Sequence, residues 1–151
     1  MNVEDLIRQY VNQSNIMQLA TCLNDQPWVV TVHFYADADL NLYWSSRSDR
    51  RHSQEIAANP NVSATILTHE NTTEENWVIG LTASGQAEQL DSLGDDITGA
   101  YIKKLLKDPE LPFKIASGAV PDKWYRLKLL SIILFDNKDF PTEPRQEWHA
   151  K

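Results

Sequence analysis

Three short runs of β-branched and aromatic residues follow one another near the start of the chain, and they constrain the fold more than any other feature. The runs are Ile16–Leu23, Trp28–Tyr35 and Leu40–Ser45. Turn-forming residues separate them, Asn24–Pro27 after the first run and Asp37–Asp39 before the third. Such runs favour a half-buried pleated surface, and short turns favour antiparallel neighbours. We therefore expect an antiparallel three-stranded meander.

The rest of the chain alternates strands with helices. The expected helices are Val3–Asn12, capped by Asn2, Asp49–Ala58, capped by Ser48 or Asp49, and Asp95–Leu106; the expected strands are Asn61–Thr68, Trp77–Leu90, Lys123–Leu129 and Ser131–Phe135. Gly80 and Gly85 interrupt the longest strand, and each predicts a bulge that curves the sheet. The polar residues 69–76 read as a loop and Asp108–Pro112 as a connection. This order predicts a mainly β protein with inserted helices.

Composition narrows the class of protein. The 151 residues carry a formal net charge of −7, and their length fits one domain over residues 1–151 with a polar tail from about Asp136. Nucleic-acid affinity comes largely from neutralising phosphates, so this acidic chain is a poor candidate for it. The single cysteine, Cys22, excludes an intrachain disulfide, and its apolar surroundings predict a buried, unreactive thiol. Neither a signal segment nor a membrane span is evident, and we expect a cytoplasmic protein.

Three of the chain's six arginines lie within five positions, at the start of the helix expected from Asp49. The cluster consists of Arg47, Arg50 and Arg51, preceded by Ser45 and Ser46 and followed by His52. A helix N-terminus presents free N–H groups and a partial positive charge, so hydroxyls and arginines beside it suit a phosphate dianion. The alternative is a solvated face, in which the arginines pair with Asp49 and Glu55 in exposed salt bridges worth less than about 1 kcal/mol each.

The order of these segments resembles the pyridoxamine 5′-phosphate oxidase-like family of FMN-binding split barrels. The segments that carry the likeness are LYWSS, DRRHSQEIAANP, NVSATI and GLTASGQAEQL, within a span from about Ile16 to Phe135. In that family a hydroxyl residue closes the third strand, a basic pair opens the next helix, and an asparagine-proline follows. Ser46, Arg51-His52 and Asn59-Pro60 occupy those places here.

The resemblance implies a six- to seven-stranded antiparallel split β-barrel of the FMN-binding type. The expected FMN-binding residues are Val29, Val30 and Thr31, whose backbone lies along the flavin ring, Ser45, Ser46, Arg50, Arg51 and His52 around the phosphate, and Trp44 beside it. Family members are usually homodimers with a flavin site at the interface, built from both subunits. Trp77, or the strand Ile79–Ser84, would then come from the partner.

The C-terminal tail matches short bacterial members of the family, which carry an aspartate-asparagine after the last strand and a tryptophan near the end. Asp136-Asn137 and Trp148 stand at these places. A large indole is costly to leave in water, so we expect Trp148 to fold over the ligand site or the dimer interface. The alternative is an isolated exposed tryptophan, which is common on protein surfaces.

Two departures argue against pyridoxamine phosphate as substrate. The second strand, WVVTVHF, lacks the arginine of true pyridoxamine phosphate oxidases, and the late arginine-bearing motif is missing, with Arg145 alone in the tail. No residue pattern indicates a catalytic acid or base, and the four histidines lack metal-ligand spacing. Two functions remain open: an FMN-dependent oxidoreductase of unknown substrate, or a non-enzymatic protein that binds flavin or haem.

Overall fold

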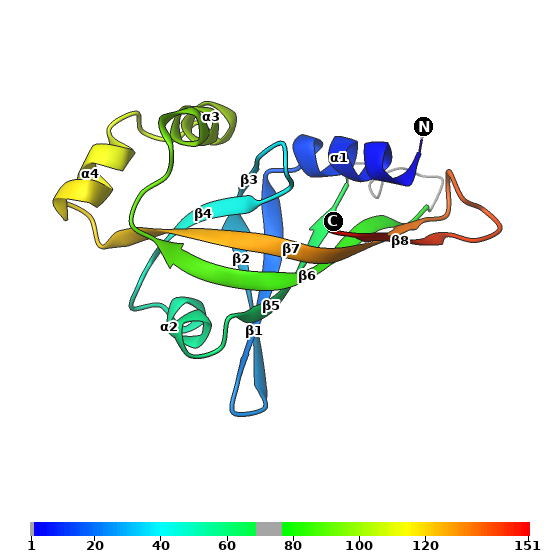
Figure 1. Ribbon diagram of the computed structural model, residues 1–151, viewed down its shortest axis with the longest axis horizontal. Coiled ribbons are helices and arrows are strands. Elements are labelled where there is room, and N and C mark those ends of the chain that lie inside the picture. The colour runs from blue at the N-terminus through cyan, green and yellow to red at the C-terminus, as the bar shows by residue number, and fades with distance from the viewer. Residues whose placement is uncertain (1, 69–76) are drawn as a thin grey trace.

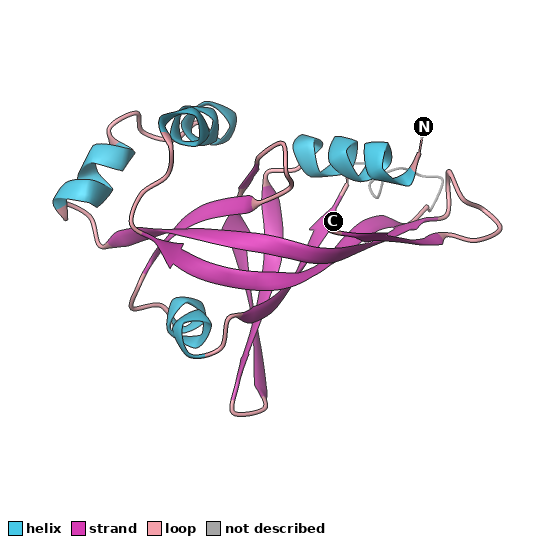
Figure 2. Ribbon diagram, in the orientation of Figure 1, coloured by secondary structure: helices cyan, strands magenta, loops and turns pink. Residues whose placement is uncertain are grey.

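The computed structural model describes residues 2–68 and 77–151. The helices in these ranges are α1 (Val3–Gln13), α2 (Arg51–Ala58), α3 (Asp95–Leu105) and α4 (Leu111–Ser117); the strands are β1 (Ile16–Leu23), β2 (Gln26–His33), β3 (Tyr35–Ala36), β4 (Leu42–Arg47), β5 (Asn61–Leu67), β6 (Ile79–Leu90), β7 (Asp122–Asp136) and β8 (Arg145–His149). The eight described strands form one antiparallel sheet in the order β2-β1-β5-β6-β7-β4-β3, with β8 also on β7. The sheet curls, with the helices at its margins (Figures 1 and 2). The mainly β split-barrel fold is confirmed.

The first hairpin follows directly from its turn residues. Asn24 and Asp25 have φ values of 52° and 60°, the left-handed region that a two-residue turn with the right twist requires. The turn sets Leu23 opposite Gln26 and fixes the register of β1 against β2 down to Ile16 opposite His33. The hairpin tip projects at the bottom of the view in Figure 1.

The expected meander is wrong, because the third run pairs with the second only at its last residue, Tyr35, which lies in β3 and not in β2. β4 lies between β3 and β7, and within the described ranges β2 pairs with β1 alone. The carboxylate of Asp37 accepts hydrogen bonds from the backbone N–H of Asp39 and Asn41, which makes a tight β3–β4 turn. Leu40 adopts φ 63° in this turn, so β4 begins two residues later than expected. Side-chain alternation identifies strands but not their distant partners.

Three local expectations also change. The strands expected either side of Leu130 are one continuous strand, β7, and the short helix α4 begins at Leu111, within the expected Asp108–Pro112 connection. A register shift marks the bulge at Ser84/Gly85, and none occurs at Gly80. At Gly85 a Cβ atom would lie 2.2 Å from the Lys128 carbonyl oxygen, so the close approach of β6 and β7 requires glycine. The loop expected over residues 69–76 lies outside the described residues.

The core divides into two clusters. The larger one fills the inside of the sheet under α1, whose Asn2 side chain accepts the backbone N–H of Asp5 at 2.8 Å as expected of its cap. The smaller one joins α3 and α4 to the sheet, where the Tyr101 and Trp124 rings meet edge to face. Among the described helices, none combines the length and the apolar character that crossing a membrane requires.

The tail is an ordered part of the sheet. β8 pairs with β7, which sets Trp148 opposite Ile132, and the half-buried Trp148 packs against the main core. Asp136 is fully buried at the start of the connection; it accepts the Tyr10 hydroxyl at 3.0 Å and the backbone N–H of Asp139 at 2.9 Å. Asn137 accepts the backbone N–H of Val78 at 2.9 Å. The aspartate-asparagine pair thus directs the chain back along β7.

Candidate functional site

A cavity of about 540 Å³ opens between β2, the end of β4 and the start of α2. We call it the arginine groove. It brings together seven of the expected FMN-binding residues: Val30, Thr31, Ser45, Ser46, Arg50, Arg51 and His52. Trp28, Val32, Arg47 and Asp122 complete its lining. The fold therefore joins the second expected strand to the start of the expected helix, as the resemblance implies.

The start of α2 lacks a side-chain cap. The cap residue is Arg50 rather than Ser48 or Asp49, it makes no side-chain capping bond, and the first turn contains no acidic residue. Asp49 is drawn away by Arg47, whose Nε and Nη2 donate to its carboxylate at 3.0 and 2.7 Å. An eight-residue helix that begins without a cap or an acid leaves its first N–H groups and its positive dipole end open to an anion.

The three arginines differ in how much of their charge is already compensated. Arg47 pairs with Asp49, and the Nε of Arg51 donates to Glu55 at 2.6 Å. The Arg51 guanidinium also lies 4.2 Å from the centre of the Trp28 ring, a cation–π contact. Arg50 forms no ion pair with any residue that the structure describes. The pairing expected of a solvated face thus holds for Arg47, the partner of Arg51 is buried, and Arg50 keeps its charge without an ion pair among the described residues.

A buried carboxylate fixes the position of Arg51. Glu55 is 4% exposed, and its other oxygen accepts the hydroxyl of Thr21 at 3.1 Å. The hydrogen bond from Arg51 lowers the pKa of Glu55 from its ordinary value, and Thr21 acts in the same direction. Because the ionised carboxylate has both partners in place, it holds the Arg51 side chain against α2 and leaves its outer face toward the groove.

Two hydroxyl residues at the end of β4 are held by neighbours. The Ser46 Oγ lies 2.7 Å from the Nε2 of His52, and either atom can supply the proton. Burial lowers the pKa of His52 below its ordinary value of 6.5, and the charge of Arg50 lowers it further. The backbone N–H of Ser45 donates to the Tyr101 hydroxyl oxygen at 3.3 Å, and the Ser45 Oγ lies 3.3 Å from the same oxygen. His52 is therefore neutral at neutral pH, and the groove holds its polar groups in fixed places.

The free edge of β2 supplies backbone groups beside the groove. In a two-residue hairpin the residues that flank the turn form a hydrogen-bonded pair, and such pairs then alternate with non-bonded ones. The register therefore directs the backbone N–H and C=O groups of Val29 and Thr31 away from β1. Pro27, which has no N–H, occupies one of these outward positions, as an edge strand allows.

Two residues expected at the site, Trp44 and Trp148, lie elsewhere in this chain; Val29 turns only its backbone toward the groove, and the expected contribution of Trp77 from a partner stays a prediction. Val29 is 61% exposed, with its side chain on the outer face of the sheet rather than in the groove. Trp44 is fully buried and stacks on Tyr125, with ring centres 5.6 Å apart, so it is a core residue. Trp77 lies just before β6, with the Lys138 ammonium 5.1 Å from its ring. Trp148 lines a different cavity.

The sequence signals missed part of the lining. Trp28 is not among the site residues expected from the sequence, yet it lines the groove, is 42% exposed and lies beneath Arg51. Its position two residues before Val30 on a strand could have placed both side chains on one face. Asp122 reaches the groove only because β7 pairs with β4, with Asp122 opposite Arg47.

Cys22, expected to be buried, is half-buried on the outer face of the sheet. No group of His, Cys, Asp and Glu in the described ranges is arranged to hold a metal ion.

Solved structures confirm this fold in distant relatives. The chain is similar to HutZ, the haem storage protein from Vibrio cholerae (TM-score 0.67, 17% identity, covering 85% of this chain and 91% of that one). It is also similar to Campylobacter jejuni ChuZ, with a TM-score of 0.77 and 14% identity over 97% of this chain and 59% of that one. A putative pyridoxamine 5′-phosphate oxidase from Listeria innocua has a TM-score of 0.63 and 18% identity over 88% of this chain and 98% of that one. The chain thus spans little more than half of ChuZ. No curated protein matches it in sequence.

A family model adds evidence from the sequence itself. The model for pyridoxamine 5′-phosphate oxidase matches residues 3–129, which include every strand from β1 to β6, the whole of α2 and the arginine groove. The match thus covers most of the chain and ends within β7. On this evidence and the shared split-barrel fold, the chain belongs to the pyridoxamine 5′-phosphate oxidase family.

Proposed function

We propose that this protein binds FMN in the arginine groove, with the phosphate at the start of α2. The observation that carries the proposal is the combination of an uncapped helix start and an uncompensated arginine at the same residue, Arg50. Arginine at a helix N-terminus opposes the helix dipole, so its charge there is unfavourable until an anion binds. Ser46 and the outer face of Arg51 would complete the contacts to the phosphate oxygens.

The flavin ring would lie along the free edge of β2. The outward backbone groups of Val29 and Thr31 could bond its polar edge, and the groove is large enough for a ligand of this size. Bound FMN supplies the hydride and electron chemistry, while the chain's own residues bind, orient and limit access. The protein would then be an oxidoreductase that passes electrons from a small donor, such as a reduced nicotinamide, to an acceptor other than pyridoxamine phosphate.

A homodimer with the ligand at its interface fits the outer face of the sheet. Pairing places residues in cross-strand rows on this face, and from β2 to β7 two successive rows contain no charge: Thr31, Gln18, Thr65, Thr82 and Ile133; Val29, Ala20, Ser63, Ser84 and Ser131. On β8 these rows continue to Glu147 and His149. Leu67 and Val29 are 63% and 61% exposed on this face. A face that is uncharged from β2 to β7 and carries exposed apolar side chains, in an acidic chain, supports the proposal that another subunit covers it.

Light scattering tests this assembly. We expect a dimer for the parent chain and a monomer for Thr65→Lys, because the new ammonium would be buried without a partner in the middle of the uncharged face. A mass near the 17.3 kDa monomer for the parent at micromolar concentration would contradict the proposal.

Haem is the second candidate ligand, because HutZ is a haem storage protein and another similar structure is a haem-binding protein from Mycobacterium smegmatis (TM-score 0.70, 16% identity). A split-barrel protein that holds haem without turnover would use the same fold. The groove of this chain offers His52 as its histidine, but that ring is 6% exposed and bonded to Ser46. The geometry therefore favours a phosphate-bearing ligand.

The absorbance spectrum of the purified protein separates flavin from haem. We then expect FMN to bind apoprotein much more tightly than riboflavin, which has the same ring without the phosphate, because the groove's charge acts on that phosphate. Reduction of bound FMN by NADH or NADPH, followed by its absorbance, separates an oxidoreductase from a binding protein. Equal affinities for FMN and riboflavin would contradict the phosphate site.

A further inference from the structure

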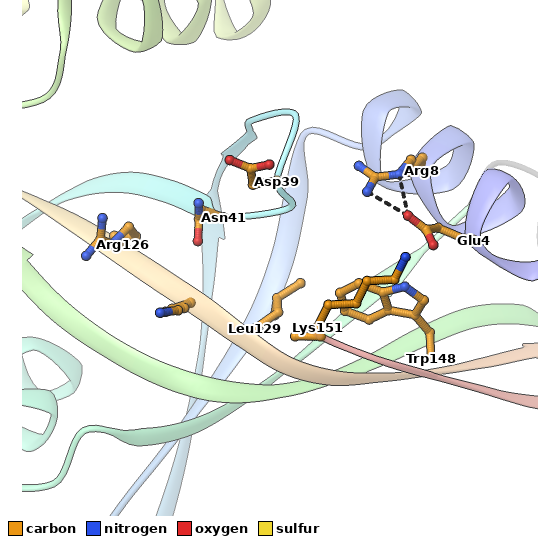
Figure 3. A pocket seen from close by; sticks show the side chains of 10 residues that line it. Glu4, Arg8, Asp39, Asn41, Arg126, Leu129, Trp148 and Lys151 are labelled. Atoms are coloured by element: carbon orange, nitrogen blue, oxygen red, sulfur yellow. Dashed lines mark hydrogen bonds and ion pairs between the residues drawn. The ribbon is translucent and has the colours of Figure 1, made fainter.

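A second cavity, of about 550 Å³, lies away from the arginine groove (Figure 3). We call it the β8 pocket. Four separate segments line it: α1 with Glu4 and Arg8, the β3–β4 turn, β7 with Arg126 and Lys128, and the end of the chain with Trp148 and Lys151. No residue of the arginine groove takes part. Its volume is in the range of small-molecule sites.

The charges around the β8 pocket are unevenly compensated. Arg8 donates to Glu4 at 2.8 Å and to the Ala38 carbonyl at 2.5 Å, and Arg126 pairs with Glu88. Lys128 and Lys151 form no ion pair with any described residue, although the charge of Lys151 makes a small contribution to lowering the pKa of Glu4. Two unpaired ammonium groups on one cavity stand out in a chain of net charge −7. They favour an anionic ligand.

The β8 pocket also has an aromatic wall, formed by Trp148. Trp148 is half-buried, held on the core by β8, and its indole contributes with Arg8 to lowering the pKa of Glu4. Figure 3 shows Trp148 and Lys151 at one end of the cavity and Arg126 at the other, with Leu129 between them. A ring and an aliphatic side chain next to ammonium groups suit a ligand with a flat apolar body and a negative end.

We propose that the β8 pocket binds a small aromatic monocarboxylate, with its ring against Trp148 and its carboxylate between Lys128 and Lys151. A monoanion fits better than a phosphate dianion, because Glu4 and the nearby Asp39 also face this space and would repel a higher charge. Binding at this site needs no flavin, so it can be tested independently of the proposal for the arginine groove.

The test uses 1-naphthoate as the probe and nuclear magnetic resonance of the full chain labelled with ¹⁵N. We expect millimolar naphthoate to shift the Trp148 indole N–H signal. Lys128→Gln and Lys151→Gln should each weaken binding about threefold to tenfold, since each removes one exposed charge contact. Lys123→Gln is the matched control, because Lys123 is exposed on the same strand but lies outside the pocket. Both lysine changes are on the surface and leave the core intact.

Three results would overturn the proposal. The first is an unmoved Trp148 signal at millimolar naphthoate. The second is a set of shifts centred on Ser46 and His52, which would place the anion in the arginine groove. The third is equal binding of uncharged 1-naphthamide, or equal weakening by Lys123→Gln, either of which would show that the lysine charges are not what the pocket uses.

Discussion

The arginine groove and the β8 pocket both gather positive charge in an acidic chain, but the fold assembles them differently. In the groove the three arginines come from one five-residue stretch, which runs from the end of β4 to the first residue of α2. In the pocket the cations come from α1, β7 and the residues after β8, which meet only because β8 pairs with β7. A local cluster can be recognised in a sequence, whereas a site built by long-range pairing cannot.

Each region also rests on one buried carboxylate, with different partners. Glu55 under the groove is held by a cation, Arg51, and by the Thr21 hydroxyl. Asp136 beside the tail is held without a cation, by the Tyr10 hydroxyl and by backbone N–H groups. Burial and the Asp136 hydrogen bond raise the pKa of Tyr10, so its hydroxyl remains a donor. The two carboxylates therefore allow each region to be disturbed separately.

Asp136→Ala is expected to have the largest effect. It removes the acceptor of the Tyr10 hydroxyl and of two backbone N–H groups, so we expect a loss of about 2–4 kcal/mol in the free energy of unfolding. Urea denaturation measures this loss. Asp139→Ala, at an exposed position with one contact of 3.2 Å to the same hydroxyl, should cost much less. Equal denaturation midpoints for Asp136→Ala and the parent would contradict the role of Asp136.

Arg51→Ala should have a smaller effect on stability, and Arg50→Ala smaller still. Removal of Arg51 leaves the buried Glu55 with Thr21 as its one remaining side-chain partner, so the urea midpoint should fall. Arg50 has no such partner, and its removal relieves the conflict with the α2 dipole. Equal midpoints for the two variants would show that the Arg51–Glu55 pair does not support α2.

The third prediction concerns protonation in the groove. The pKa of His52, followed by the ring signals in nuclear magnetic resonance, should lie below 6.5 in the free protein. Because the unfolded chain then takes up this proton first, His52 lowers the free energy of unfolding as pH falls below about 6.5, and the loss ends below the folded pKa. Arg50→Ala should raise the pKa of His52, since it removes a nearby positive charge. A pKa at or above 6.5 in the free parent would contradict this account.

What the sequence predicts also depends on whether a site is built from neighbouring residues or by long-range strand pairing. Ser46, Arg50, Arg51 and His52 are close in the chain, so their meeting at one groove could be predicted from a helix start alone. Trp44 could not be placed, because its strand pattern fits either a core or a site position, and only the β4–β7 pairing buries it against Tyr125.

The pairing partners of the strands are the main part of the fold that the sequence does not predict. The alternation over residues 40–45 identified a strand, but its neighbour, β7, lies some 80 residues further along the chain. The short helix α4 carries a proline in its first turn, which helices accept there, and its seven residues give too little periodicity to detect. Trp148 did indicate an ordered tail, as burying an indole can hold a short segment.

FMN titration of the apoprotein, followed by flavin fluorescence, tests the central claim that the phosphate binds at the start of α2. We expect Arg50→Ala to weaken FMN binding at least about tenfold, because a charge-assisted contact contributes roughly 1.5–3 kcal/mol. Riboflavin affinity should be unchanged in this variant, and Lys128→Gln in the β8 pocket should bind FMN like the parent. Equal FMN affinities for Arg50→Ala and the parent, or an equal loss for riboflavin, would contradict the claim.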